Sequence, residues 1–241
     1  MQITIFDSKQ ELGKAAASLF AAQILTKKDS VLGFATGSSP LETYAGLIDY
    51  HQKGILDFSA VQTYNLDEYV GLEDTHPQSY AYFMNENLFS KINIRKENCH
   101  LPNGMAKDTE TECLRYEGEI RAAGGIDLQL LGIGHNGHIG FNEPSGSFAN
   151  ITNCVTLTKE TIDANKRFFA SAEEVPKRAL SMGIGTIMRA RAIVMVVNGA
   201  DKADVIAKAV RGAVTPEVPA SILQFHPQVT LLLDKAAAGK L

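Results

Sequence analysis

The sequence predicts an α/β fold, with an open, mostly parallel, twisted sheet and helices on both faces. Short runs rich in β-forming residues alternate with longer helical patterns along the chain. Two of the strand candidates, residues 126–134 and 191–199, are nearly continuous apolar runs, as is typical of central parallel strands buried on both faces. The chain has 241 residues, 45% of them hydrophobic, which suffices for one large core. We therefore expect residues 1–241 to form a single domain.

The elements follow one another in a regular order. The predicted strands are residues 31–36, 61–67, 126–134, 191–199 and 229–234, with a weaker candidate at 153–158. The predicted helices are residues 8–27, 40–52, 79–92, 111–125 and 201–212, the last two closed by glycine. Ser8 is expected to cap the first helix, with Glu11 completing a capping box. The polar stretch 142–153 is interpreted as a loop rather than a domain boundary.

Composition and charge exclude several classes of protein. The net charge is −4 and no basic block occurs, which argues against a nucleic-acid surface. No apolar run approaches the roughly 20 residues that cross a bilayer, and the first residues lack the features of a signal peptide. Three widely spaced cysteines, Cys99, Cys113 and Cys154, match no metal or disulfide pattern and indicate free thiols. We expect a cytoplasmic protein that acts away from membranes.

Ligands of open α/β sheets bind beyond the carboxyl ends of the strands, so the residues that follow each strand are the candidates. Gly37, Ser38, Ser39 and Pro40 follow the first predicted strand and precede a helix. A glycine turn with two hydroxyls at a helix start can cradle a phosphate. An ordinary serine-capped helix would have the same pattern and is the commoner case for the motif alone.

Asp67 and Glu68 end the second predicted strand. Adjacent side chains of an extended chain point to opposite faces, so at most one of these carboxylates faces a given pocket. A carboxylate at this edge can act as a general base. A solvated turn is the alternative, and in isolation it is the more common one.

The stretch "LLGIGHNGHIGFNEP", residues 130–144, places many polar groups among four glycines. His138 can transfer protons near neutral pH, and a folded-back loop can bring Glu143 to its imidazole. His135, His138 and Glu143 match no strong metal-binding pattern, so no metal site is expected. Histidines that merely form hydrogen bonds in a glycine turn are the alternative.

Two basic residues complete the candidates. Arg167 lies in "DANKRFF", and Lys202 follows the strand at 191–199. Each alone is typical of a solvated surface. Together with the Ser38 loop, they can close around a phosphate, with the Arg167 guanidinium as a fork and the Lys202 ammonium as a point charge.

The chain resembles the glucosamine-6-phosphate deaminase family along nearly its whole length. The matching stretches are "LGFATGSSPLETY", "YNLDEYVGL", "HPQSYAYFM", "GIGHNGHIGFNEP", "ANKRFF", "VPKRALSMGIGTIMRA" and "ILQFHP". Lactonases that act on phosphogluconate share the wider Rossmann-like fold, but we do not expect them to carry both "LDEYVGL" and "NGHIGFNEP". The resemblance implies conversion of glucosamine 6-phosphate and water to fructose 6-phosphate and ammonia.

The resemblance also implies roles for the candidate residues. Asp67 is expected to take the C2 proton and return it to C1, and His138 to open the pyranose ring. Glu143 and Asn136 are expected to orient and tune His138. The implied phosphate grip consists of Gly37, Ser38, Ser39, Arg167 and Lys202. No cofactor is implied, because the amine and carbonyl of the substrate supply the electron sink, and His135 is given no role.

Two departures from the family pattern bear on function. Asn136 stands where many members have aspartate, and an uncharged amide should hold the protonated His138 less firmly. The large allosteric members also carry basic residues after "FNEP", whereas this chain has no Lys or Arg from there until Lys159. We therefore expect a monomer or low oligomer without activation by N-acetylglucosamine 6-phosphate.

Two other functions remain open from the sequence. One is a different reaction on the same fold, sugar-phosphate isomerisation or 6-phosphogluconolactone hydrolysis. The other is a non-catalytic sugar-phosphate sensor, although the chain lacks the basic segment that a DNA-binding regulator would need.

Overall fold

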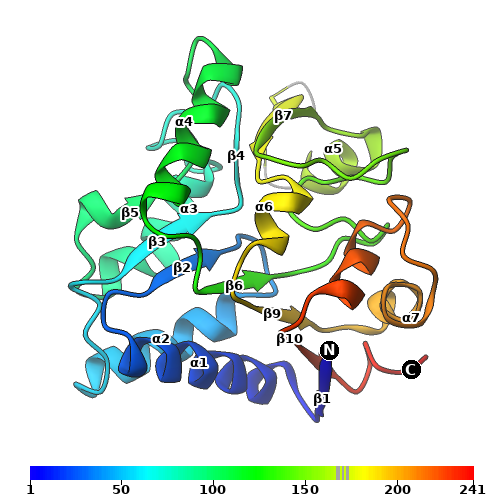
Figure 1. The fold of residues 1–241 in the computed structure, drawn as a ribbon, viewed down its shortest axis with the longest axis horizontal. Coiled ribbons are helices and arrows are strands. Elements are labelled where there is room, and N and C mark those ends of the chain that lie inside the picture. Colours follow the sequence, from blue (N-terminus) through cyan, green and yellow to red (C-terminus); the bar gives the residue numbers. More distant parts are fainter. Residues whose placement is uncertain (167–168, 170, 172–173) are drawn as a thin grey trace.

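A seven-stranded parallel sheet forms the centre of the molecule (Figure 1). The structure is a computed structural model that describes residues 1–166, 169, 171 and 174–241. Within these residues the strands lie in the order β1 (Gln2–Phe6), β10 (Val229–Asp234), β9 (Ala192–Val197), β6 (Leu128–Leu131), β2 (Val31–Phe34), β3 (Gln62–Asn65) and β5 (Cys99–His100). Each neighbouring pair is parallel. The predicted sheet is thereby confirmed.

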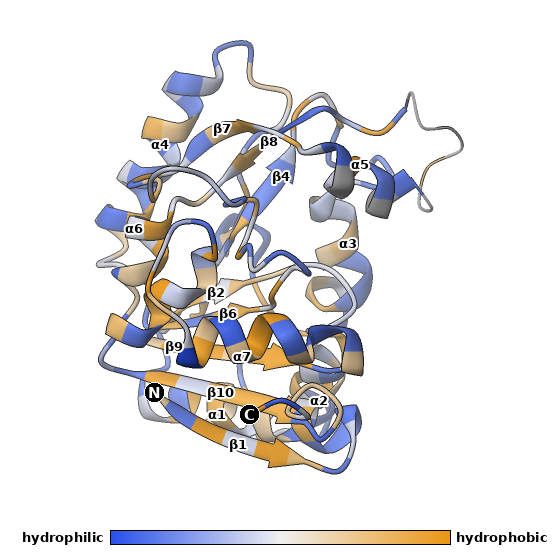
Figure 2. Ribbon diagram, turned by 90° about the vertical axis from the view of Figure 1, so that its right-hand side faces the viewer, coloured by the Kyte–Doolittle hydropathy of each residue, from blue (hydrophilic) through white to orange (hydrophobic). Residues whose placement is uncertain are grey.

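Helices cover both faces of this sheet, as predicted. One face packs on α1 (Lys9–Thr26), α2 (Leu41–Gln52) and α3 (Tyr80–Asn87), and the other on α4 (Thr109–Ala122), α6 (Ile184–Met188) and α7 (Ala203–Arg211). Short 3₁₀ helices occupy Phe89–Lys91, Lys96–Asn98, Ala200–Lys202 and Pro219–Phe225. Figure 2 shows α7 banded by hydrophobic and hydrophilic residues, as expected for a helix that buries one side.

The strand order reverses between β2 and β6. From β2 the chain proceeds outward through β3 to β5, then returns to β6 on the other side of β2 and continues to β9 and β10. A crevice at such a reversal, beyond the carboxyl ends of the strands, is where open α/β sheets bind ligands. The loops that follow β2, β6 and β9 therefore define the place to look for a site.

A second, antiparallel sheet lies beside the first and consists of β4 (Asp67–Tyr69), β8 (Arg178–Ser181) and β7 (Asn153–Thr156). The predicted strand 61–67 is wrong in its extent, because it splits at Leu66. The Leu66 N–H binds the carbonyl of Phe34 in the large sheet at 3.0 Å, and its own carbonyl accepts the Met182 N–H at 2.7 Å. Asp67 consequently begins a strand of the small sheet.

The remaining elements differ from the prediction in detail. Ser8 caps α1 through the Glu11 N–H at 3.2 Å, but the Glu11 carboxylate accepts from Asp7 rather than from Ser8. The strands β1, β5 and β8 and the helices α5 (Lys159–Asn165) and α6 were not predicted. No helix within the described ranges is long and apolar enough to cross a membrane.

Candidate active site

The glycine-rich loop after β6 brings Asn136, His138 and Glu143 together. Its turn is closed by a hydrogen bond of 2.9 Å from the Gly134 N–H to the carbonyl of His138. The imidazole of His138 lies directly over Gly134, where an added Cβ would be 2.2 Å from the ring. Gly137 has a φ of +92°, a conformation that favours glycine. These glycines therefore allow the chain to fold tightly around a reactive side chain.

Glu143 is the centre of this cluster. Its Oε2 accepts the Asn136 amide at 2.6 Å and lies 3.3 Å from Nδ1 of His138, in an ion-pair contact rather than a well-aligned hydrogen bond. Its Oε1 accepts the hydroxyl of Thr161. Burial raises the pKa of Glu143, but His138, Thr161 and Asn136 outweigh it and lower the pKa to about 2. Glu143 is thus an anion at neutral pH, beside the imidazole of His138.

Asn136 contacts this pair from the loop. Its amide donates to Glu143, while its Oδ1 accepts the backbone N–H of His138 at 3.2 Å. Asn136 therefore binds the carboxylate partner and the main chain of His138 and, in this conformation, does not hold the ring directly.

Asp67 lies close to the same loop although it comes from a different sheet. A Cβ built on Gly140 would be 3.6 Å from Oδ2 of Asp67. The hydroxyl of Ser181, the residue paired with Asp67 across β4 and β8, accepts the Phe141 N–H at 3.0 Å. The small sheet therefore fixes the loop of His138 beside the carboxyl group of Asp67.

The environment of Asp67 makes it a strong base for a carboxylate. The side chain is buried, and among the described residues no group donates a hydrogen bond to it. Burial, with the charge of Glu68 added, raises the pKa of Asp67 to about 8. Such a group takes up a proton readily once it is ionised.

We expect the substitution Asp67→Asn to stabilise the protein most at alkaline pH. An unfolded aspartate titrates near pH ~3.9, so folding retains a proton that the unfolded chain has lost between that pH and about 8. The stability of the native sequence therefore falls as pH rises through this window, whereas that of the asparagine variant does not. In thermal unfolding, the Tm of the variant should exceed that of the native protein by about 5 °C at pH ~8.5 and by much less at pH ~4.5. An equal difference at both pH values would contradict this.

The loop after β2 has the form of an anion cradle. Gly37 has a φ of +99°, and among the described residues no side chain caps the first turn of α2. The Ser38 and Ser39 hydroxyls are thus not used as helix caps, contrary to the commoner interpretation of the motif, and the first N–H groups of α2 remain open to an anion. Ser39 lies near Gly132 of the neighbouring loop: a Cβ built on Gly132 would be 3.9 Å from Cβ and 4.0 Å from Oγ of Ser39.

Lys202 follows β9, at the same edge of the sheet. Partial burial lowers its pKa, and the neighbouring Asp201 opposes this effect. Asp201 also contacts His135 at 2.7 Å, which ties the Lys202 segment to the glycine-rich loop. The prediction for Arg167 stays a prediction, since this residue lies outside the described residues.

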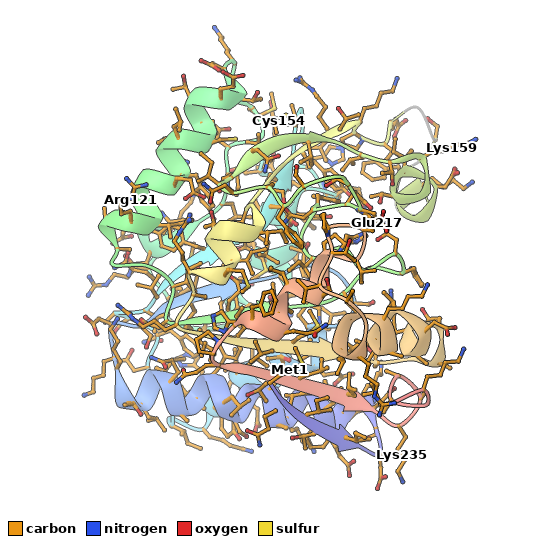
Figure 3. All side chains as sticks on the ribbon, turned by 45° about the vertical axis from the view of Figure 1, so that its right-hand side comes forward. Met1, Arg121, Cys154, Lys159, Glu217 and Lys235 are labelled. Carbon is orange, nitrogen blue, oxygen red and sulfur yellow. The ribbon has the colours of Figure 1, made fainter. Side chains whose placement is uncertain are left out.

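Thr161 is the contact that sequence reasoning missed. It belongs to α5, which begins at the side-chain cap Thr158. Figure 3 shows Lys159, the first residue of this helix, at the periphery, whereas Thr161 is buried and reaches Glu143. The T-x-x-T spacing can indicate a helix start, but nothing local indicates that the helix docks on the glycine-rich loop.

The fold is that of an α/β enzyme, with the candidate residues Asp67, His138 and Glu143 gathered near the switch point of a parallel sheet. Across the described part of the chain, no group of three or more His, Cys, Asp or Glu side chains is arranged to hold a metal ion.

Comparison with known proteins identifies the family. A model of the family described as glucosamine-6-phosphate isomerases/6-phosphogluconolactonase matches residues 7–232. The chain is 55% identical over 239 residues to the glucosamine-6-phosphate deaminase of Thermoanaerobacter pseudethanolicus, covering 99% of this chain and 94% of that protein. It is 52% identical over 241 residues to that of Clostridioides difficile, covering 100% and 97%. The chain belongs to this family.

Solved structures agree with the assignment. A monomeric glucosamine-6-phosphate deaminase superposes with a TM-score of 0.97 at 44% identity, with full coverage of both chains. The 6-phosphogluconolactonase of Trypanosoma brucei superposes with a TM-score of 0.77 at 20% identity, over 100% of this chain and 98% of that one, and shares the fold.

Proposed function

We propose that this protein converts D-glucosamine 6-phosphate and water to D-fructose 6-phosphate and ammonia, with the whole chain of 241 residues acting as one catalytic unit. The observation that carries the proposal is that two different acid–base groups, the Asp67 carboxyl and the His138 imidazole, come from different sheets and lie close together. The carboxyl of Asp67, whose pKa is raised, lies beside the loop that holds the His138–Glu143 ion pair. The relatives named as glucosamine-6-phosphate deaminases support the choice of substrate.

Asp67 acts as the base in the isomerisation. It removes the proton from C2 of the open-chain aldose and returns it to C1, while O1 gains one proton and the amine nitrogen loses one, which converts the 2-amino aldose to the 2-imine of the ketose. Its burial makes the carboxylate basic and keeps the transferred proton from exchanging freely with water. Addition of one water to the imine and departure of one ammonia complete the reaction.

His138 acts before this step. The imidazole gives a proton to the ring oxygen and accepts one from the anomeric hydroxyl, which opens the pyranose. Glu143 keeps the imidazole ring oriented, and Asn136 in turn orients Glu143. The substrate supplies its own electron sink, so the proposal requires no cofactor.

The phosphate group binds the first turn of α2, with Gly37, Ser38 and Ser39 providing N–H and hydroxyl donors and with Lys202 and Arg167 as cations.

We expect Lys202→Met to raise KM for glucosamine 6-phosphate by about tenfold and to change kcat much less, because the ammonium binds a non-reacting part of the substrate. Steady-state kinetics, with inorganic phosphate as a competitive inhibitor, would measure this. Lys208→Met, on the neighbouring α7, is the matched control. An unchanged KM together with unchanged inhibition by phosphate would show that Lys202 does not bind the phosphate group of the substrate.

We further propose a monomer or low oligomer without allosteric activation. The segment after Glu143 carries no basic residue before Lys159, so it lacks cations for an activator's phosphate. The rate should depend hyperbolically on substrate, with or without N-acetylglucosamine 6-phosphate. A sigmoidal curve that becomes hyperbolic on adding this compound would contradict the proposal.

A further inference from the structure

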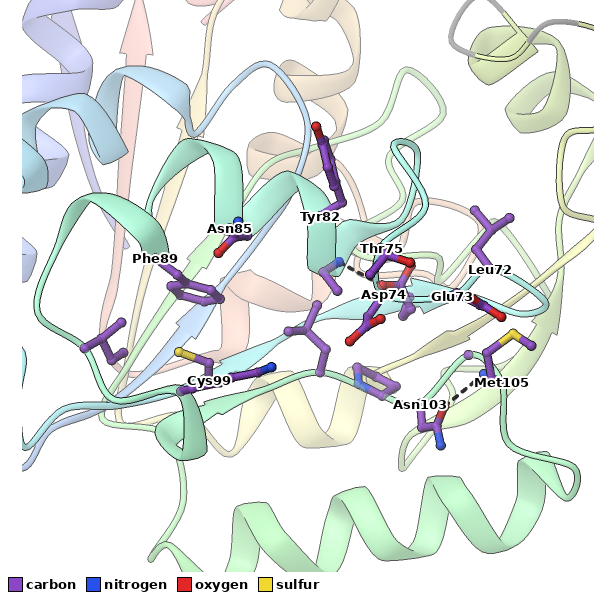
Figure 4. Close-up of a pocket in the computed structure, with 17 residues that line it drawn as sticks. Leu72, Glu73, Asp74, Thr75, Tyr82, Asn85, Phe89, Cys99, Asn103 and Met105 are labelled. Atoms are coloured by element: carbon purple, nitrogen blue, oxygen red, sulfur yellow. Dashed lines mark hydrogen bonds between the residues drawn. The ribbon is translucent and has the colours of Figure 1, made fainter.

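Glu68 is a second buried carboxyl group, next to the proposed base on β4. Its side chain points away from Asp67 in the alternation of the strand, and only 3% of the residue is exposed. It lies in the wall of a groove of about 900 Å³, between β4, α3 and the segment 101–105 (Figure 4). The acid–base chemistry proposed above does not use it.

The two neighbouring carboxyl groups differ in their hydrogen bonds. The Glu68 carboxylate accepts three backbone N–H groups, from Tyr69 at 2.8 Å and from Tyr80 and Ala81 at 2.9 Å each. Tyr80 and Ala81 begin α3, where N–H groups lack partners within the helix and the helix dipole favours an anion. The three N–H groups thus favour the charged form of Glu68, and Asp67 has no equivalent donor among the described residues.

Burial raises the pKa of Glu68 to about 7 even though these three N–H groups lower it. The pKa of Asp67 lies higher still, at about 8. Because Glu68 has three N–H donors and Asp67 has none among the described residues, Glu68 loses its proton before Asp67, and its charge then opposes ionisation of Asp67.

We propose that Glu68 is a positioning residue that makes Asp67 a stronger base. Its carboxyl group, next to Asp67 on β4, is held in place by three N–H groups, and its bonds to α3 anchor the strand that carries Asp67. This inference rests on the proposed role of Asp67 and deepens it, since a more basic carboxylate removes a weakly acidic C2 proton faster once it is ionised.

Besides His138 and Glu143 on the adjacent glycine-rich loop, the titratable groups around the pair are tyrosines on four elements and one exposed acid. Asp67 faces Tyr44 of α2, Tyr69 of β4, Tyr80 of α3 and Tyr116 of α4, and burial raises the pKa of each of these phenols. They stay neutral between pH ~6 and ~9, well below their ordinary pKa near 10. Asp74 faces Glu68 from the groove and raises its pKa further. Among the described groups, Glu68 is the one whose charge raises the pKa of Asp67.

The test compares the pH dependence of kcat/KM in four proteins. Glu68→Gln removes the charge, Glu68→Asp keeps it on a shorter arm, and Glu73→Gln removes an exposed charge from the same groove. In Glu68→Gln the acid limb of the kcat/KM profile should move about one pH unit lower. The plateau value of kcat/KM should fall about threefold to tenfold. The acid limbs of Glu68→Asp and Glu73→Gln should match the native one. If Glu68 only anchors β4 to α3, both Glu68 substitutions should lower kcat/KM, but the acid limb of the Glu68→Gln pH profile should stay where it is in the native protein. That result would overturn the proposal.

A second measurement covers the case in which Glu68→Gln does not fold, as judged by circular dichroism. In the native protein with ¹³C-labelled aspartate, the Asp67 carboxyl resonance should titrate in two steps, because Glu68 ionises before it. A single step would overturn the proposal. If Asp67→Asn stays active, the proposed base itself is wrong. If that variant is inactive and the limb of Glu68→Gln is unmoved, only the role of Glu68 fails.

Discussion

The substitution Asp67→Asn should lower kcat for glucosamine 6-phosphate by about 10³-fold and leave KM within about threefold. An asparagine has nearly the same volume and fits the buried position, but it cannot accept the C2 proton. Binding should persist because the phosphate contacts come from other loops. Ammonia release would report kcat, and calorimetric titration would report substrate binding by the inactive variant.

The matched control is Asp49→Asn, the same change at an exposed carboxylate of α2. It should behave like the native protein. An Asp67→Asn variant with more than a tenth of native kcat would exclude Asp67 as the base. Loss of binding, in a protein with no turnover to lose, would instead favour a sugar-phosphate sensor.

The second large effect is expected for His138→Gln, which should lower kcat/KM by about 10²-fold. Glutamine keeps a polar group over Gly134 but cannot exchange a proton with the ring oxygen. His135→Gln is the natural control, because this histidine lies on the same loop, is exposed, and pairs with Asp201 rather than with Glu143. It should retain nearly full activity.

A modified substrate separates ring opening from isomerisation. A 4,5-dideoxy analogue of glucosamine 6-phosphate lacks both oxygens that could close a furanose or pyranose ring. With this compound the deficit of His138→Gln should shrink to less than about tenfold, whereas Asp67→Asn should stay inactive. An undiminished deficit with the analogue would place His138 in the isomerisation step instead.

The sequence predicted those parts of the fold that local patterns encode. The apolar runs at β6 and β9 indicated buried parallel strands, and the glycines after β6 indicated a tight loop with room for a ligand. Elements with little local signal were missed, among them β5, which has two residues, and α6, which has five. The strand order and its reversal beside β2 depend on pairings between distant segments, which local patterns do not contain.

The same distinction holds for the candidate site. Asp67, His138 and Glu143 stood out because reactive side chains follow strands, and the structure brings them to one edge of the sheet. The split of the strand at Leu66 was not predictable from alternation, since the residues on both sides remain extended while their partners change from β2 to β8. The Thr161–Glu143 and Glu68–α3 contacts join residues 18 and 12 to 13 positions apart, through packing that spacing does not reveal.

The most direct test of the account is the simultaneous measurement of ammonia and fructose 6-phosphate formed from glucosamine 6-phosphate by the purified protein. Both products should appear in equal amounts, and 6-phosphogluconolactone should not be hydrolysed above the uncatalysed rate. Formation of fructose 6-phosphate in equal amounts with ammonia would support deamination coupled to isomerisation. Absence of ammonia, with the lactone hydrolysed instead, would contradict it.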